Sequence, residues 1–227
     1  PTGIALRAYV HHPALREQLR HLEVVWHKAL RPGYGWIFPC GGDVYNIGVG
    51  AFQGTGPQAN LRDVFEAFTQ FYEPARLLMQ GGTVQGELKG APLRCTLAGA
   101  RYSRPGVLAV GEAIGSTYDF TGEGIGKAME TGLMAADALT AGRGPGRARD
   151  DAAVRADYEA RLAALAPQFR LYEKANRINA HPWLADLVIW RAKKSPRLLQ
   201  RMTGVLNETS NPGNLVTARG LLRLFTE

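Results

Sequence analysis

The sequence predicts an α+β protein in which an antiparallel sheet is followed by a single strand–loop–helix segment and then by a helical C-terminal region. Three observations lead to this prediction. Residues 33–39 and 44–52 are strand-like and flank a glycine turn, as in a hairpin. Residues 106–139 pass from an apolar run through a glycine-rich loop into a helical repeat. After residue 150, apolar side chains recur at helical spacing.

Length and composition set limits on the class of protein. A chain of 227 residues can bury a sizeable core in one or two domains. No apolar run is long enough to cross a membrane. The two cysteines, Cys40 and Cys95, are far apart and lack metal-ligand spacing, which favours a reducing, cytoplasmic compartment and argues against a metal site.

The basic residues are concentrated near the C-terminus. Lys and Arg number 27 against 20 Asp and Glu, and residues 165–227 hold ten of the former and four of the latter. Such a tail is suited to nucleic acid, an anionic membrane surface or a polyanion. No nucleic-acid motif accompanies it, so we expect no nucleic-acid partner and rank peripheral membrane contact first, with an ordinary solvated surface as the alternative.

The first third of the chain predicts most of the sheet. Residues 4–11 and 22–28 are strand candidates, joined by a short helix or a loop. In the strand 33–39, side chains alternate between faces, so three aromatic rings share one face: Tyr34, Trp36 and Phe38. These rings form either a broad apolar wall or part of the core. In the strand 44–52, Gly48 and Gly50 leave one face bare, which suits close approach of a ligand or a backbone.

The middle of the chain predicts one helix and two short strands. Residues 61–79 carry apolar side chains at helical spacing, with Asn60 as the candidate N-cap. Residues 83–88 and 93–98 are the strand candidates that follow.

The segment 106–139 has the features of a ligand-binding turn. Its apolar run, 107–110, predicts a short buried strand. The helix that ends the segment places its apolar residues on one face: Ile125, Met129, Leu133, Ala136 and Leu139. Glycines at a helix start expose backbone N–H groups to an anion. The carboxylate of Glu112, at the strand end, can accept hydrogen bonds from sugar-like hydroxyls. The alternative is a glycine-rich turn that binds nothing.

The C-terminal region predicts helices only. Residues 153–171 are strongly helical, with one apolar stripe that contains Tyr158, Leu162, Leu165 and Phe169. Segments 182–192, 196–206 and 214–225 read as shorter helices separated by Pro, Ser and Asn-Pro-Gly.

Two glycine motifs resemble the second flavin-contact motif of FAD-dependent reductases and hydroxylases. They are Gly111-Glu112-Ala113-Ile114-Gly115 and Phe120-Thr121-Gly122-Glu123-Gly124-Ile125. The resemblance implies FAD as the cofactor, a carboxylate on the ribityl chain, and a helix start facing the pyrophosphate and the flavin. The residues that it implicates are Gly111, Glu112, Ala113, Gly115, Gly122, Glu123, Gly124 and Ile125. Glu112 replaces the usual Asp, and the usual proline before the second motif is absent.

The hairpin makes the resemblance more specific. GYGWIFP, followed by a turn and NIGVG, is similar to the signature of the geranylgeranyl reductase family. The family resemblance implies reduction of isoprenoid carbon–carbon double bonds in lipid biosynthesis, with NAD(P)H or ferredoxin as the electron donor. It places Tyr34, Trp36, Phe38 and Pro39 in the cavity for an isoprenoid or another apolar substrate. Cys40 stands where the family often has Lys.

The family comparison also defines a domain scheme. It comprises a substrate-binding α+β domain (1–104), the C-terminal part of the FAD-binding domain (105–141), a linker (142–150) and a helical region (151–227). The G-x-G-x-x-G unit that holds the ADP half of FAD is absent. We therefore expect a fragment, or a partner of a separate N-terminal FAD-binding chain.

The alternatives are a flavin-dependent monooxygenase or halogenase-like enzyme of the same fold, and a non-catalytic fragment or membrane-surface binding module. No catalytic acid or base can be assigned from the sequence, because the cofactor carries the chemistry.

Overall fold

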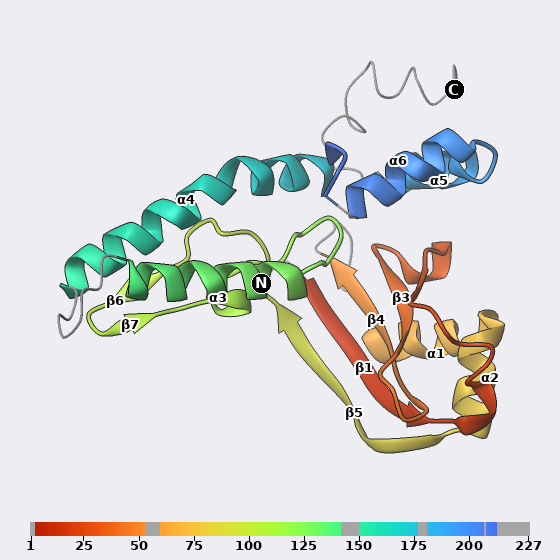
Figure 1. The fold of residues 1–227 in the computed structure, drawn as a ribbon. Helices are drawn as coiled ribbons and strands as arrows, with labels where there is room; N and C mark the ends of the chain where they lie inside the picture. Colours follow the sequence, from red (N-terminus) through yellow and green to blue (C-terminus); the bar gives the residue numbers. More distant parts are fainter. Residues whose placement is uncertain (1–2, 53–59, 142–149, 177–180, 207, 213–227) are drawn as a thin grey trace. The chain divides into compact units, whose positions relative to one another are not determined.

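The computed structural model describes residues 3–52, 60–141, 150–176, 181–206 and 208–212. It divides into two compact units, one formed by residues 1–92 with 179–186 and the other by residues 93–178 with 187–227. The predicted fold class is confirmed, since an antiparallel sheet precedes a loop–helix segment and further helices (Figure 1). The predicted domain boundary at 104–105 lies inside the second unit.

The first unit contains a five-stranded sheet. Its strands are β1 (Gly3–His11), β2 (Glu23–Val25), β3 (Gly33–Pro39), β4 (Val44–Phe52) and β5 (Thr83–Leu93), in the order β2-β3-β4-β1-β5. The predicted hairpin is confirmed, and Trp36 of β3 pairs with Gly48 of β4 in antiparallel register. The candidate strand 22–28 is shortened to β2 and ends before a 3-10 turn, η2 (Lys28–Leu30). The link between β1 and β2 contains another such turn, η1 (Pro13–Leu15).

The candidate strand 83–88 is confirmed, but the separate candidate strand 93–98 is wrong. One continuous strand, β5, runs from Thr83 to Leu93, and Cys95 makes only an isolated bridge to Thr117. Proline is tolerated in a strand at a sheet edge, where its missing N–H is not required by a neighbour. The edge position of β5 therefore explains why Pro92 does not end it.

The predicted helix 61–79 is two helices, α1 (Leu61–Phe71) and α2 (Glu73–Gly81). Tyr72, between them, has an extended backbone with φ −97° and ψ 107°. Pro74 sits in the first turn of α2, where its missing N–H costs nothing, whereas inside one long helix it would break a hydrogen bond. The N-cap prediction is confirmed, because Asn60 Oδ1 accepts the N–H of Arg62 at 3.0 Å.

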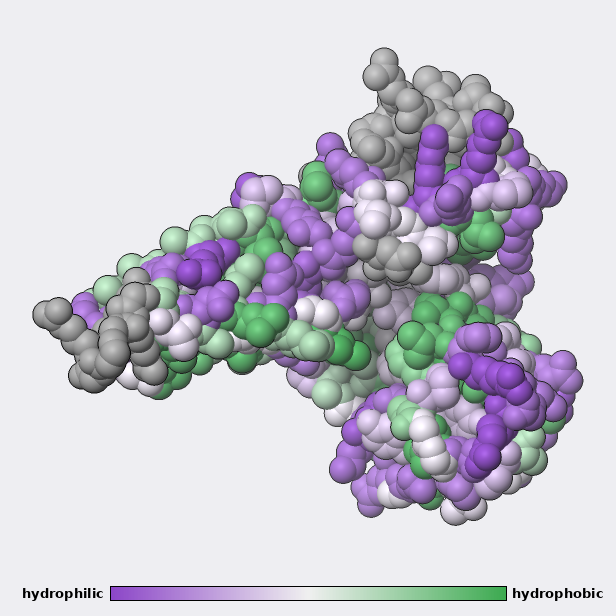
Figure 2. Space-filling view, viewed as in Figure 1, coloured by the Kyte–Doolittle hydropathy of each residue, from purple (hydrophilic) through white to green (hydrophobic). Residues whose placement is uncertain are grey.

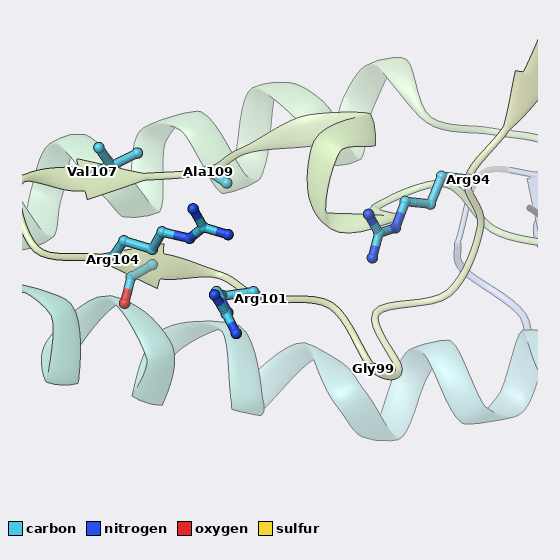
Figure 3. Close-up of a pocket in the computed structure, with 7 residues that line it drawn as sticks. Arg94, Gly99, Arg101, Arg104, Val107 and Ala109 are labelled. Atoms are coloured by element: carbon cyan, nitrogen blue, oxygen red, sulfur yellow. The ribbon is translucent and has the colours of Figure 1, made fainter.

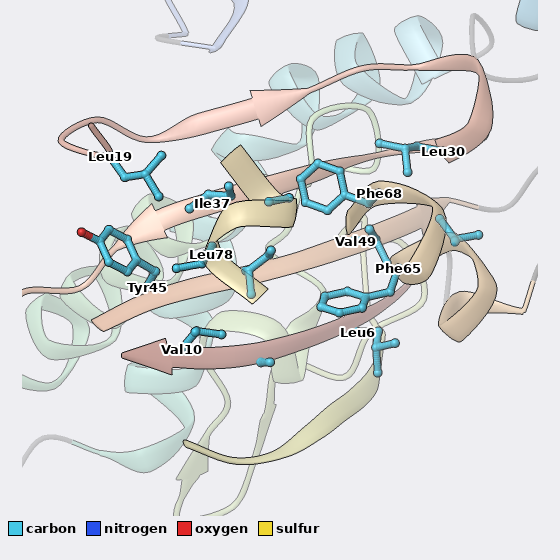
Figure 4. Close-up of a cluster of buried hydrophobic side chains, with 14 of the residues drawn as sticks. Leu6, Val10, Leu19, Leu30, Ile37, Tyr45, Val49, Phe65, Phe68 and Leu78 are labelled. Atoms are coloured by element: carbon cyan, nitrogen blue, oxygen red, sulfur yellow. The ribbon is translucent and has the colours of Figure 1, made fainter. Parts of the chain in front are cut away.

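The core of the first unit lies between the sheet and these two helices. Figure 4 shows the side chains of α1 and α2 packed on one face of the strands. The principal core residues are Leu6, Val10, Ile37, Val49, Phe65, Phe68 and Leu78. Gly35 of β3 has no side chain because the Phe68 ring lies where its Cβ would be.

The second unit is mainly helical. A short hairpin joins β6 (Ser103–Arg104) to β7 (Val107–Leu108), and a 3-10 turn, η3 (Gly111–Ile114), follows. Helix α3 (Ile125–Thr140) packs along α4 (Asp151–Asn176), as Figure 1 shows. The predicted stripe on α4 is confirmed as buried, and Pro167 does not end this helix.

Two of the three short C-terminal helices are confirmed. They are α5 (Pro182–Ala192) and α6 (Pro196–Leu206). The predicted helix 214–225 and most of the predicted linker lie outside the described residues. None of the described helices combines the length and the apolar character needed to cross a bilayer.

Candidate functional site

The turn after β7 is built by close packing against α3. Gly111 has φ +63°, a conformation that favours glycine, and a Cβ there would lie 3.2 Å from the Cβ of Ala128. Its N–H donates to Thr131 Oγ1 at 3.0 Å. This glycine therefore allows the turn to lie directly on the first turns of α3.

The prediction of a buried strand at 107–110 is wrong. Only Val107 and Leu108 are strand, and Val107 and Val110 are 56% and 39% exposed. The reason is that β7 pairs only with β6 in the described part of the chain, so no wider sheet covers its side chains. These valines are apolar surface that lacks a cover within the described second unit.

Glu112 lies in η3 with its side chain exposed. Its Oε1 accepts the N–H of Arg94 at 3.3 Å, which holds the carboxylate at the edge of the turn. A carboxylate has room for several hydrogen bonds, so the group can still accept from a ligand hydroxyl. Ala113, beside it, is exposed as well, and Gly115 is buried with φ +75°.

Glu123 occupies the start of α3. Its Oε1 accepts the N–H of Gly126 at 2.8 Å, and this satisfies one of the helix's free donors. The space beside the N-cap residue, Gly124, is filled by the Thr117 hydroxyl. The start of α3 is therefore partly covered by the side chains of Thr117 and Glu123. The N–H of Gly126 is already bonded to the Glu123 carboxylate and is not available to an anion.

One buried oxygen atom of Glu123 is suited to accept a hydrogen bond from a ligand. Glu123 Oε2 is buried and has no hydrogen-bond partner among the described residues. A buried acceptor without a donor is costly, so such atoms point to a missing partner. Together with the exposed Glu112 carboxylate, it provides acceptors suited to the hydroxyl and N–H donors of a flavin, so these residues fit the implied cofactor.

The loop between the two motifs packs under α4. The Tyr118 ring stacks on Tyr172 with centroids 3.8 Å apart, and Asp119 Oδ2 accepts from Asn176 Nδ2 at 3.0 Å. Asp119 is 7% exposed, and its Oδ1 has no partner among the described residues. Burial, with a smaller contribution from the charge of Glu173, raises the pKa of Asp119 to about 6, although the hydrogen bond from Asn176 opposes this shift.

Because Asp119 is buried, its ionisation should lower the free energy of unfolding as the pH rises. The Asp119→Asn variant should not show this loss. Below the unfolded pKa of 3.8 the carboxyl is protonated in both states. Between 3.8 and about 6 the unfolded state ionises first, so the free energy of unfolding falls as the pH rises, and above about 6 the loss is constant. We expect Asp119→Asn to match the wild type near pH 3.5 and to exceed it at pH 7 by about 1–3 kcal/mol. Urea unfolding across this pH range measures the difference. The account is contradicted if the stability of Asp119→Asn relative to the wild type is lower at pH 7 than at pH 3.5.

The sequence did not predict that Lys127 is buried and ion-paired. This side chain is 7% exposed, and its Nζ lies 2.7 Å from Glu130 Oε2 and 2.8 Å from Glu208 Oε2. It shares the buried face of α3 with Thr131, Ala135 and Ala138. The signal in the sequence was the run of small residues at helical spacing after Lys127, which marks a face that packs closely.

The apolar face predicted for α3 exists but points outward. Ile125 is 80% exposed, Met129 67%, Leu133 66% and Leu139 44%. Figure 2 shows hydrophobic surface along this part of the molecule. We call these four residues the apolar α3 face. Isolated exposed apolar residues are ordinary, but an aligned row on one helix marks a contact surface.

The second group of predicted site residues lies on the sheet of the first unit. Tyr34, Trp36 and Phe38 occupy the face of β3 opposite the one that packs on α1, and we call them the aromatic face. Their rings follow one another at centroid distances of 6.1 and 6.0 Å, and all three are half-buried. They do not pack on α1 or α2, so the alternative that assigns them to the core beneath these helices is not what the structure shows. Pro39 ends the strand.

The bare glycine face of β4 is covered by Trp36. Its indole lies where a Cβ of Gly48 would be and within van der Waals range of Gly50, and its Nε1 donates to Asn46 Oδ1 at 2.9 Å. The two glycines therefore make room for the Trp36 ring and not for a ligand or a second backbone. The result is a row of adjoining aromatic rings across β3 and β4.

The described residues contain no cluster suited to a metal ion. Neither Cys40, which is exposed, nor Cys95, which is buried, forms a disulfide.

The fold belongs to a class that includes flavin-dependent enzymes. The structure matches the flavin-dependent brominase Bmp2 with a TM-score of 0.51 and 15% identity, over 99% of this chain and 55% of that one. This likeness concerns the fold alone. No family model matches the chain.

The curated proteins that the chain resembles in sequence are named as reductases. The chain is 32% identical over 145 residues to menaquinone reductase of Mycolicibacterium smegmatis, covering 62% of this chain and 35% of the relative. It is 32% identical over 110 residues to digeranylgeranylglycerophospholipid reductase 1 of Methanococcoides burtonii, covering 46% and 24%. The predicted resemblance to geranylgeranyl-type reductases is confirmed by these relatives, of which the chain spans about a quarter to a third.

Proposed function

We propose that this chain is the substrate-binding and flavin-contacting part of an FAD-dependent reductase that acts on isoprenoid carbon–carbon double bonds. The observation that carries the proposal is the aromatic face, a row of half-buried rings on the sheet face opposite α1 and α2. An isoprenoid chain offers only apolar surface, and rings of this kind favour it by removing that surface from water. The reductases among the relatives support the same assignment.

In this proposal the chain's own residues bind and orient. FAD supplies the hydride chemistry when bound. Glu112 accepts a hydrogen bond from a hydroxyl of the ribityl chain, and Glu123 Oε2 accepts from another donor of the cofactor. The aromatic face holds the alkene and excludes water from it.

A second chain or segment completes the cofactor site. A G-x-G-x-x-G unit is absent from this sequence, and the relatives are about three to four times longer than their matched regions. We propose that an α/β dinucleotide-binding unit packs on the apolar α3 face. NAD(P)H or ferredoxin is the proposed electron donor, and basic residues on and after α5 are the proposed peripheral membrane contact.

Replacing Glu112 by Gln in the complex with that unit should weaken FAD binding. The change keeps the shape but removes the charge that strengthens a hydrogen bond, so we expect a Kd about 10-fold higher. Flavin fluorescence titration measures it. The matched control is Glu66→Gln, which removes an exposed carboxylate from α1. If the wild type and Glu112→Gln bind FAD with equal Kd, Glu112 is not part of the cofactor site.

Product analysis tests the proposed reaction. With reduced flavin and a prenylated lipid under anaerobic conditions, the reductase yields a product heavier by two hydrogens per double bond. The second candidate is a monooxygenase or halogenase, which the fold of the brominase favours. A product that forms only with oxygen, and that gains oxygen or halogen, would replace our proposal by this one.

A further inference from the structure

A cavity of about 510 Å³ lies in the second unit, beside the β6–β7 hairpin. Three arginines line it, Arg94, Arg101 and Arg104, together with Ser103 and the side chains of Val107 and Ala109 (Figure 3). Figure 3 shows Arg101 and Arg104 next to one another and Arg94 reaching in from the other end. This volume lies in the range of small-molecule sites.

The arginines carry charge that the described residues do not neutralise. No ion pair joins any of the three guanidinium groups to a carboxylate in the described part of the chain. Three carboxylates nearby make contacts other than an ion pair with these arginines. Glu159 Oε1 accepts from Ser103 Oγ at 2.6 Å, Glu112 accepts the backbone N–H of Arg94, and Asp151 pairs with Arg155. Neighbouring cations without counter-charges repel one another, so an anion in the cavity would lower the energy of the site.

We propose that this cavity binds the phosphate or diphosphate group of an organic phosphate. A guanidinium presents its donors as a planar fork that matches two phosphate oxygens, and three such groups suit a polyanion better than a single carboxylate. The methyl groups of Val107 and Ala109 provide apolar wall for the carbon portion of the ligand. We call this site the arginine cavity.

The inference goes beyond the proposed function and does not depend on it, because it rests on the charge and shape of the cavity. Two sources share this chemistry, a free or cofactor-borne diphosphate and a phospholipid headgroup. The experiment separates them by presenting the anion either in solution or on a membrane surface.

Calorimetric titration of the purified chain with inorganic pyrophosphate is the first arm. Co-sedimentation with phosphatidylcholine vesicles, with and without phosphatidic acid, is the second. The test variant is Arg101→Gln/Arg104→Gln. The matched control is Arg62→Gln/Lys89→Gln, which removes two exposed cations from α1 and β5 of the first unit, outside the basic C-terminal region. Thermal unfolding of each variant confirms that the fold is intact.

We expect saturable binding in at least one arm, weakened at least 10-fold in Arg101→Gln/Arg104→Gln and unchanged in the control. Binding of pyrophosphate identifies a soluble phosphate ligand, and binding only to phosphatidic acid vesicles identifies a headgroup. The proposal is overturned if the wild type binds neither probe, or if both double variants lose binding equally, since the effect would then reflect net charge alone.

Discussion

A Met129→Asp/Leu133→Asp variant of this chain should no longer associate with a dinucleotide-binding unit and should lose FAD retention in its presence. Both side chains are about two-thirds exposed in this structure and lie on the apolar α3 face. Burying a large apolar side chain contributes about 1.5–3 kcal/mol, and burying an unpaired carboxylate in its place opposes the contact strongly. The combined effect of two such changes is expected to weaken association at least 100-fold.

Co-purification measures this effect. The partner is the portion of the Mycolicibacterium smegmatis relative outside the region that this chain matches, expressed with a tag. Size-exclusion chromatography with flavin absorbance reports the complex. The control is Leu199→Asp, which adds an aspartate on α6 at a leucine that is 56% exposed. An aspartate pair on α3 that leaves the complex intact would show that the apolar α3 face is not the contact surface.

The largest change in stability is expected from Phe68→Ala. The Phe68 ring is fully buried between α1 and the sheet, fills the space over Gly35 and stacks on Tyr72 with centroids 5.6 Å apart. Truncating a buried phenylalanine removes its transfer free energy and leaves a cavity, at a cost of about 3–5 kcal/mol. Equilibrium unfolding in urea gives the difference in the free energy of unfolding.

Phe71→Ala provides the comparison on the same helix. Phe71 is 38% exposed and stacks on His27 with centroids 4.0 Å apart, so its loss should cost only about 1 kcal/mol. Similar losses for the two variants would contradict the core described here, since they would imply that α1 does not bury Phe68 against the sheet.

The sequence predicted the sheet hairpin and the C-terminal helices well because their signals are local. Alternation in 33–39 and helical spacing in 153–171 each depend on neighbours within a few residues. The break between α1 and α2 was missed although Pro74 was visible, because the apolar positions continue at helical spacing across it. The continuation of β5 through Pro92 depends on its place at the sheet edge, which is a property of the assembled fold.

The candidate site shows the same division. The aromatic face followed from alternation, whereas Glu112, expected at the end of a strand, lies in the 3-10 turn η3. The sequence did not predict the capping of α3 by Glu123 or the packing of Trp36 over Gly48. Both arise from contacts between side chains and backbone that form only in three dimensions. The helical pattern of α3 identified an apolar face correctly, but periodicity does not tell which face is packed. Here the small-residue face with Lys127 is buried, and the apolar one is free within the described unit.

The most direct test of the central claim follows the flavin absorbance near 450 nm in the complex of this chain with the dinucleotide-binding unit. The bound FAD is reduced without oxygen, and a geranylgeranyl-bearing lipid is then added. We predict that the oxidised band returns as the double bond is reduced, and that this return is lost in the Met129→Asp/Leu133→Asp variant. A band that returns only when oxygen is admitted, with the lipid unchanged, would contradict the assignment as an isoprenoid reductase.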